Sequence, residues 1–178
     1  MRLIKIKLQN KGYQKKKKWP WIVTGLIVAI IVFLVVSYMI ATAPKREAKA
    51  EAFKIAQAKK GIQSISAFYY YNGIKDTYSV IVGPNKKGVE TAVFVPRGKK
   101  TNKSSKVVSY RMSDGISKKD ANNIAIKEKQ PAKILTTNIG MDEGTPIWEI
   151  SYRKEDGTLN YFEINFITGA WYRQINNL

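Results

Sequence analysis

The feature that most constrains this chain is an uncharged, strongly apolar run near its start. Residues 19–43 read WPWIVTGLIVAIIVFLVVSYMIATA and contain no charged side chain. A helix rises about 1.5 Å per residue, so about 20 apolar residues cross the hydrocarbon core of a bilayer. A lone segment in hydrocarbon must satisfy its own backbone hydrogen bonds, which only a helix can do. The run therefore predicts a transmembrane helix over 19–43, with Trp19, Trp21 and Tyr38 anchoring it in the headgroup regions of the bilayer.

The charges on either side of this run predict its orientation. Residues 1–18 contain eight basic residues and no acidic one. Beyond the run, Lys45 and Arg46 are soon offset by Glu47 and Glu51. Because the Lys/Arg excess stays in the cytoplasm, we expect a cytoplasmic basic tail over 1–18 and an extracellular C-terminal part, in a single-pass protein of the cell membrane.

A cleaved secretory signal peptide is the alternative reading of the same segment. Ala41, Thr42 and Ala43 spell a small-residue cleavage site. However, the apolar run is longer than the 7–15 residues typical of a signal peptide, and Pro44 would stand directly after the cut. We therefore expect an uncleaved signal anchor.

The composition narrows the chemistry and the partners of the extracellular part. The chain has no Cys and no His, so it lacks disulfides, thiol chemistry and the commonest general acid–base side chain, and we expect no cofactor and no bound metal. The formal charge is +18. A basic surface can bind nucleic acid, but outside a membrane the available anions are lipid headgroups and wall polymers. We therefore expect the bilayer and anionic wall polymers as partners, and no nucleic acid.

Residues 44–105 read as a helix followed by a small sheet. Residues 44–60 are rich in Ala, Lys and Glu, which favour a helix that ends at Gly61, and Pro44 suits a first helical turn. We expect this helix both to extend the transmembrane helix as a stalk and to pack on the domain. Strand-forming residues then occupy 65–71, 76–82 and 89–95, with Asn72-Gly73 as a two-residue hairpin turn between the first two. The polar, basic stretch 98–105 is predicted to be a linker.

Residues 106–178 repeat this pattern. Ser117 and Asp120 have the spacing of a capping box, which predicts a helix that stops before Pro131. Strands are predicted over 133–138, 147–153, 159–166 and 170–175. Trp148 alternates in phase with other large apolar residues of its strand, so we expect it to be buried between the helix and the sheet.

The two halves align at an offset of about 70 residues, which is typical of duplicated small domains. The fold class expected is α+β: an N-terminal transmembrane helix followed by two similar units, each a helix packed on an antiparallel sheet of three or four strands. The first unit, with its stalk helix, covers 44–105 and the second covers 106–178.

Several short motifs of the second half carry a family resemblance. They are GISKKDA from Gly115, WEISY from Trp148, Asp156-Gly157 and FITG from Phe166. With the basic tail, single span and stalk, these motifs resemble the TseB (YpmB) family of Gram-positive cell-wall elongation regulators, and more widely the PepSY-like, cystatin-like domains. The resemblance implies an exported module that acts in peptidoglycan synthesis on a class B penicillin-binding protein. It supplies no catalytic residues.

Two acidic pairs, Asp142-Glu143 and Glu155-Asp156, are the candidates for carboxylate catalysis. Both lie beside glycine in predicted turns, where acidic residues are common for conformational reasons. A calcium site at 142–144 would lack the spaced oxygen ligands of a loop site. We therefore expect these carboxylates to form turns and the protein not to be an enzyme.

The aromatic run Phe68, Tyr69, Tyr70 and Tyr71 is the candidate partner-binding surface. On a strand, two of these rings would point inward and two outward, and clustered exposed aromatics are enriched at protein interfaces. The alternative is that tyrosine simply favours sheets. Basic runs at Lys86-Lys87, 97–103 and Lys118-Lys119 are expected to face solvent.

The sequence is compatible with three functions. The first is a membrane-anchored extracellular interaction module that modulates peptidoglycan synthesis by binding a class B penicillin-binding protein. The second is a PepSY-like inhibitor or modulator of an exported peptidase, and the third is a polyanion-binding surface protein.

Overall fold

The computed structural model describes residues 19–98 and 106–176. The predicted cytoplasmic tail and nearly all of the predicted linker therefore lie outside the described residues. The chain divides into two compact units, Met1–Ala43 and Pro44–Leu178.

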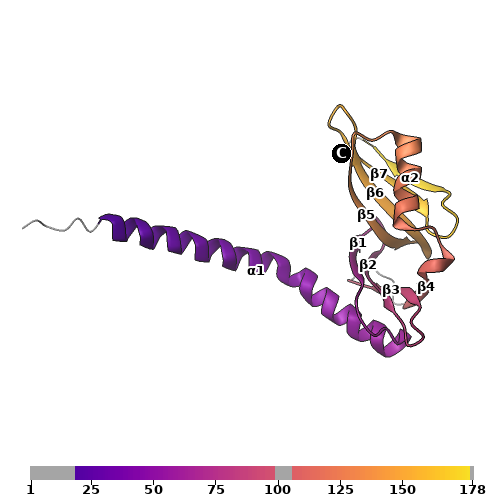
Figure 1. The fold of residues 1–178 in the computed structure, drawn as a ribbon, viewed down its shortest axis with the longest axis horizontal. Coiled ribbons are helices and arrows are strands. Elements are labelled where there is room, and N and C mark those ends of the chain that lie inside the picture. The colour runs from indigo at the N-terminus through magenta and orange to yellow at the C-terminus, as the bar shows by residue number, and fades with distance from the viewer. Residues whose placement is uncertain (1–18, 99–105, 177–178) are drawn as a thin grey trace, which may run out of the picture. The chain divides into compact units, whose positions relative to one another are not determined.

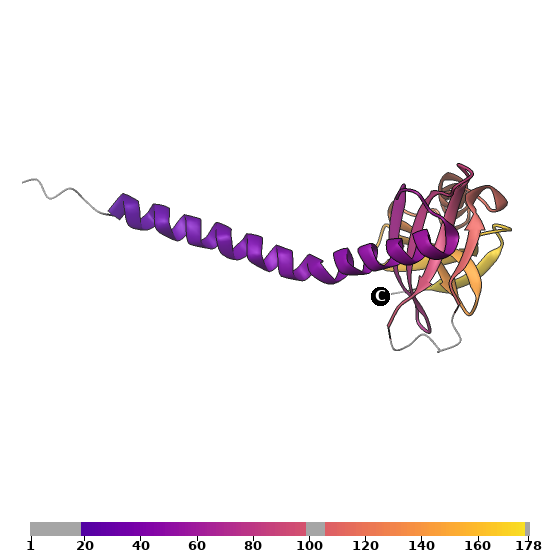
Figure 2. The ribbon, with the colours of Figure 1, turned by 90° about the horizontal axis from the view of Figure 1, so that it is seen from below.

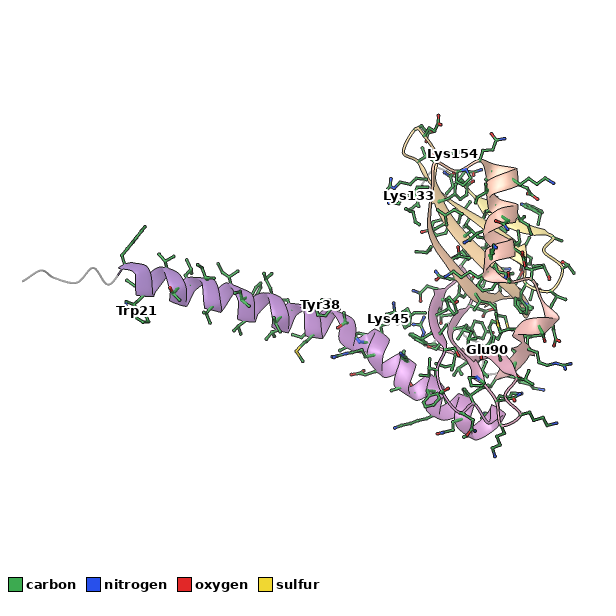
Figure 3. The ribbon with its side chains drawn as sticks, viewed as in Figure 1. Trp21, Tyr38, Lys45, Glu90, Lys133 and Lys154 are labelled. Atoms are coloured by element: carbon green, nitrogen blue, oxygen red, sulfur yellow. The ribbon has the colours of Figure 1, made fainter. Side chains whose placement is uncertain are left out.

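The helix α1 runs without interruption over Trp19–Lys60. It continues through Pro44, so the expected stalk helix extends the apolar helix, as predicted. Its first part exposes its large apolar side chains, and Figure 3 shows Trp21 near the start of the helix and Tyr38 farther along. Among the described helices, α1 alone is long and apolar enough to cross a membrane, with a mean hydropathy of 2.8 over its most apolar 18 residues.

The first sheet is an antiparallel meander of four strands in the order β1-β2-β3-β4 (Figure 1). The strands are β1 (Ala67–Asn72), β2 (Thr77–Pro84), β3 (Glu90–Pro96) and β4 (Val108–Arg111). The sequence did not predict β4, a short strand that pairs with β3 through Val108 and Phe94. A boundary drawn by strand pairing would fall after Arg111, while the division at residue 105 stays a prediction.

The β1–β2 connection is longer than the predicted two-residue turn. Asn72 pairs with Thr77, and the Gly73 N–H donates to the Asp76 carbonyl at 2.9 Å, so the loop has four residues, 73–76. A two-residue Asn-Gly turn needs positive φ at both positions, and neither Asn72 nor Gly73 has it. Gly73 serves a different purpose: a Cβ there would lie 2.8 Å from the Tyr71 hydroxyl.

The second sheet repeats the meander as β5-β6-β7-β8. Its strands are β5 (Lys133–Asp142), β6 (Thr145–Arg153), β7 (Leu159–Asn165) and β8 (Trp171–Ile175). The 3-10 turn η1 (Met112–Asp114) and the helix α2 (Lys118–Lys129) precede it. The predicted capping box is confirmed, since the Ser117 hydroxyl accepts from the Asp120 N–H at 3.1 Å and the Asp120 carboxylate accepts from the Ser117 N–H.

The helix α2 packs on one face of the second sheet (Figure 1). Its Ala121 and Ala125 are buried against Trp148, Ile150 and neighbouring side chains of the sheet. Trp148 is 1% exposed, and its indole N–H donates to the Ile116 carbonyl at 3.0 Å. The predicted burial of Trp148 between helix and sheet is confirmed.

The last turns of α1 pack against the first sheet (Figure 2). Ala52 and Ala56 are buried with Ile81, Val93 and Val95 from β2 and β3. The small alanine side chains allow the helix to approach the sheet closely. The opposite face of the first sheet shares a larger core with the second sheet.

Candidate functional site

The face of the second sheet that α2 leaves uncovered carries a groove of about 520 Å³. Side chains alternate faces along a strand, so Trp148 and Ile150 point to α2 while Glu149 and Ser151 point into the groove. The β1–β2 hairpin forms one wall through Tyr70, Asn72, Gly73 and Ile74, and the sheet supplies the rest through Leu135, Thr136, Asn138, Glu149, Ser151, Leu159, Tyr161, Glu163 and Ile175.

A row of polar residues runs across the four strands of this face. The pairing register places Glu149 beside Asn138 on one side and beside Glu163 on the other, and Glu163 in turn beside Arg173. Two glutamates are therefore direct cross-strand neighbours. Like charges directly opposite each other destabilise a sheet, so this arrangement needs a compensating cation.

Arg173 supplies a cation on the β8 side of the row only. Its Nη2 donates to Glu163 Oε1 at 3.0 Å and also lies 2.8 Å from Oε2, without a hydrogen bond to that second oxygen. Its Nη1 lies 2.9 Å from Asp142 Oδ2. The Tyr172 hydroxyl donates to the same Asp142 oxygen at 3.2 Å.

Asp142 is thus not the simple turn residue that the sequence suggested. It is 0% exposed and is held by Arg173 and Tyr172 at the end of β5. The reason for the error is that these side-chain partners lie on β8, about 30 residues farther along the sequence, and leave no local trace. Its neighbour Glu143 does lie in the turn, with φ of 48°.

Glu149 has no counter-charge of its own. Among the described residues it makes no hydrogen bond and no ion pair, while its side chain is half-buried. Burial, and then the neighbouring Glu163 carboxylate, raise the pKa of Glu149 to about 7, against a smaller lowering by Arg173. Perturbed carboxylates in a concave surface are candidates for functional groups.

Tyr71 ties the hairpin to the second sheet beside the groove. Its ring packs so closely on β5 that a Cβ at Gly140 would lie 2.3 Å from Tyr71 Cδ2. The Tyr71 hydroxyl is buried and lies next to the groove-lining Gly73, and it makes no hydrogen bond within residues 19–98 and 106–176. Burial, and then the carboxylates of Glu163, Glu149 and Asp142, raise the pKa of Tyr71 far above its ordinary value.

The tip of the same hairpin is held to the turn between β5 and β6. Lys75 Nζ forms an ion pair with the Glu143 carboxylate. The Glu143 N–H donates to Asp76 Oδ2 at 3.3 Å. Both contacts join residues nearly 70 positions apart, and they fix the hairpin wall of the groove relative to its sheet.

The four aromatic residues of β1 alternate faces, but neither pair is free. Tyr69 and Tyr71 join the core shared by the two sheets, and Phe68 packs against the cluster beneath the end of α1. Tyr70 is half-buried beneath Arg97, whose guanidinium carbon is 3.4 Å from the ring centroid. Of the four, only Tyr70 lines the groove, and their role in binding a partner stays a prediction.

The remaining candidates lie away from the groove. Glu155 is exposed, and Asp156 shapes its turn by accepting from the Thr158 N–H at 2.9 Å and from its hydroxyl at 2.7 Å. In residues 19–98 and 106–176 there is no group of three or more His, Cys, Asp or Glu side chains placed to hold a metal ion. Trp19, Trp21 and Tyr38 are exposed on α1, and their role as membrane anchors is untested.

The groove itself was missed from the sequence. The one local indication was that Glu149 alternates with the buried Trp148 and Ile150 on a correctly predicted strand, so its side chain had to lie on the opposite face. Its juxtaposition with Glu163 depends on the register of β6 and β7, and its enclosure depends on a hairpin from the other half of the chain. Neither can be derived from local periodicity.

Three comparisons with known proteins agree. Residues 51–96 match the family described as "Cell wall elongation regulator TseB-like domain". The chain is 26% identical over 155 residues to the "Probable cell wall elongation regulator TseB" of Bacillus subtilis (strain 168), covering 86% of this chain and 93% of that relative. The solved structure of the YpmB protein from Bacillus subtilis aligns with a TM-score of 0.62 and 26% identity, over 71% of this chain and 95% of that one.

Proposed function

Because the chain belongs to the TseB-like family of cell wall elongation regulators, we propose that it is a membrane-anchored, non-enzymatic regulator that acts by binding another protein outside the cell. The partner we propose is a class B penicillin-binding protein. The curated relative is described as a regulator, and no catalytic family is indicated.

The anchoring part of the proposal rests on α1 and its flanks. The helix begins with a charge-free stretch long enough to span a bilayer. The basic residues before it favour a cytoplasmic N-terminus. This arrangement would keep Pro44–Leu178 at the outer membrane surface, where membrane-bound wall synthases work.

The observation that carries the binding part is the groove between the β1–β2 hairpin and the second sheet. Its volume is about 520 Å³. It is lined by two exposed apolar side chains, Ile74 at 59% and Leu135 at 40%, and by the ring of Tyr70. Exposed apolar side chains beside a concave polar surface favour a protein contact. The unpaired carboxylate in it does not suit an anionic wall polymer.

We further infer that the two halves derive from one repeated PepSY-like module. Both sheets have the same strand order, and each follows a helix that packs on one of its faces. Tyr78 in β2 and Trp148 in β6, which align at the offset of 70, are both buried in the shared core.

Crosslinking in living cells tests the proposal. A photoreactive amino acid would replace Ile74 in the full chain, with the same replacement at Lys154, an exposed position after β6 (Figure 3), as the matched control. We expect Ile74 to capture a class B penicillin-binding protein that Lys154 does not capture. Recovery of an exported peptidase, or of wall polymer alone, would contradict the proposed partner.

A further inference from the structure

The groove is acidic although the chain as a whole is strongly basic. Two carboxylates, those of Glu149 and Glu163, line the groove, and Arg173 pairs with Glu163 and with the buried Asp142. A second guanidinium, that of Arg97, lies over the Tyr70 ring at the hairpin wall and donates to the Asn72 side chain. The formal charge of the whole chain is +18. This local excess of negative charge therefore stands out against its surroundings and would attract a cation.

The excess is concentrated at Glu149, a half-buried carboxylate that lines the groove. Arg173 satisfies Asp142 and Glu163 from the β8 side, and it does not reach Glu149 with a hydrogen bond or an ion pair. Glu163 is 2% exposed, lines the groove and is ion-paired with Arg173. The buried Tyr71 hydroxyl, next to Gly73 of the groove wall, has no hydrogen-bond partner among the residues that the structure describes. Buried polar groups without partners are uncommon and call for an explanation.

The walls of the groove add a second chemical requirement. Ile74, Leu135 and Leu159 present apolar surface near the carboxylates, with Ile74 and Leu135 largely exposed. A bare metal ion would leave this surface in water. Lysine and arginine side chains combine an aliphatic stem, which covers apolar surface, with a charged end.

We infer that the groove receives the side chain of a lysine or arginine from the protein partner, with its cationic end between Glu149 and Glu163. This inference rests on the proposed function, because it assumes that the partner is a protein. The inserted charge would complete the polar row across the sheet, where Arg173 already fills the equivalent place on the other side of Glu163. The stem of the side chain would lie against Ile74 and Leu135.

The variant that isolates this charge is Glu149→Gln. It keeps the size of the side chain and removes only the carboxylate, and the core beneath it is contributed by other residues of β6. Glu155→Gln, in an exposed turn outside the groove, is the matched control.

Peptide binding to the full chain in detergent micelles tests the inference. The probe is a fluorescent peptide, acetyl-Ala-Lys-Ala-Lys-Ala-amide, and its control carries norleucine, which has the same stem without the charge. We expect the lysine peptide to bind wild type and the Glu155→Gln variant alike, and to bind Glu149→Gln about tenfold more weakly. Equal binding to Glu149→Gln, equal binding of the norleucine peptide, or displacement of the peptide by calcium would each overturn the inference.

Crosslinking from Ile74 then separates the two proposals. If the wild-type chain captures no protein from this position, the proposed function itself fails. If wild type captures a protein partner and Glu149→Gln captures it equally well, the proposed function stands and only the cation site is refuted. Loss of capture in Glu149→Gln alone supports the cation site.

Discussion

Replacing Glu149 with glutamine should stabilise the fold at neutral and alkaline pH. Glu149 is half-buried beside Glu163 and has no cation of its own, and its pKa rises from 4.5 to about 7. One pKa unit corresponds to about 1.4 kcal/mol, so the charged form costs at most about 3 kcal/mol relative to the unfolded chain. Water reaches part of the side chain, and we therefore expect a gain of about 1–3 kcal/mol in the free energy of unfolding.

The sign of the pH dependence follows from the direction of this shift. Below pH 4.5 Glu149 is protonated in both the folded and the unfolded chain, so the glutamine variant and wild type should be equally stable. Between pH 4.5 and about 7 the folded chain holds the proton that the unfolded chain releases, and wild-type stability falls as the pH rises. Above pH 7 the cost of the charge is complete. The charged groups that face Glu149, Glu163 and Arg173, are present in both proteins.

The assay is urea unfolding of the full chain in detergent micelles, followed by far-ultraviolet circular dichroism at pH 4 and pH 8. Glu155→Gln should match wild type at both values, because Glu155 is exposed in a turn. A Glu149→Gln variant that is no more stable than wild type at pH 8, or that gains as much at pH 4, would refute the reasoning. A stabilising change that also weakens binding would identify Glu149 as a residue retained for function at the expense of stability.

Three other substitutions test the packing that supports the groove. Trp148→Ala should lower the free energy of unfolding by about 3–5 kcal/mol, because it empties the space of a fully buried ring; a loss under about 1 kcal/mol in urea unfolding would place Trp148 outside the core. Gly140→Ala should cost about 1–3 kcal/mol, because the new methyl group would overlap the Tyr71 ring; unchanged stability would show that the ring does not lie on β5. Asp142→Ala should lower the free energy of unfolding by about 1–3 kcal/mol, because Arg173 loses one of its two buried carboxylate partners and keeps only Glu163. Glu155→Ala should leave the stability nearly unchanged, and equal effects of the two substitutions in thermal unfolding would contradict the Arg173 network.

The sequence predicted the elements whose signals are local. The charge-free run predicted the first part of α1, the Ser117–Asp120 spacing predicted the start of α2, and alternation around Trp148 predicted both β6 and its buried face. Each of these signals comes from residues within a few positions of one another.

The errors come from contacts between distant segments. The short strand β4 is defined by pairing with β3 more than by its own residues, and the Gly73 loop is set by the close approach of Tyr71. Asp142 looked like a turn residue because its partner Arg173 lies on a strand three places away in the sheet. The groove required both the register of four strands and the position of a hairpin from the other half, and neither is encoded in a local pattern.

The most direct test of the central claim is the rate of peptidoglycan incorporation in cells whose sole copy of the protein carries an altered groove. The test variant is Ile74→Ser with Leu135→Ser, two exposed apolar side chains that line the groove. The control is Lys133→Ser with Lys154→Ser, two exposed residues of the same part of the chain that do not line it. With both proteins folded and present at equal levels, the groove variant should alter incorporation as a deletion of the gene does, and the control should restore the wild-type rate. Normal incorporation in cells that carry the groove variant would contradict regulation through this surface.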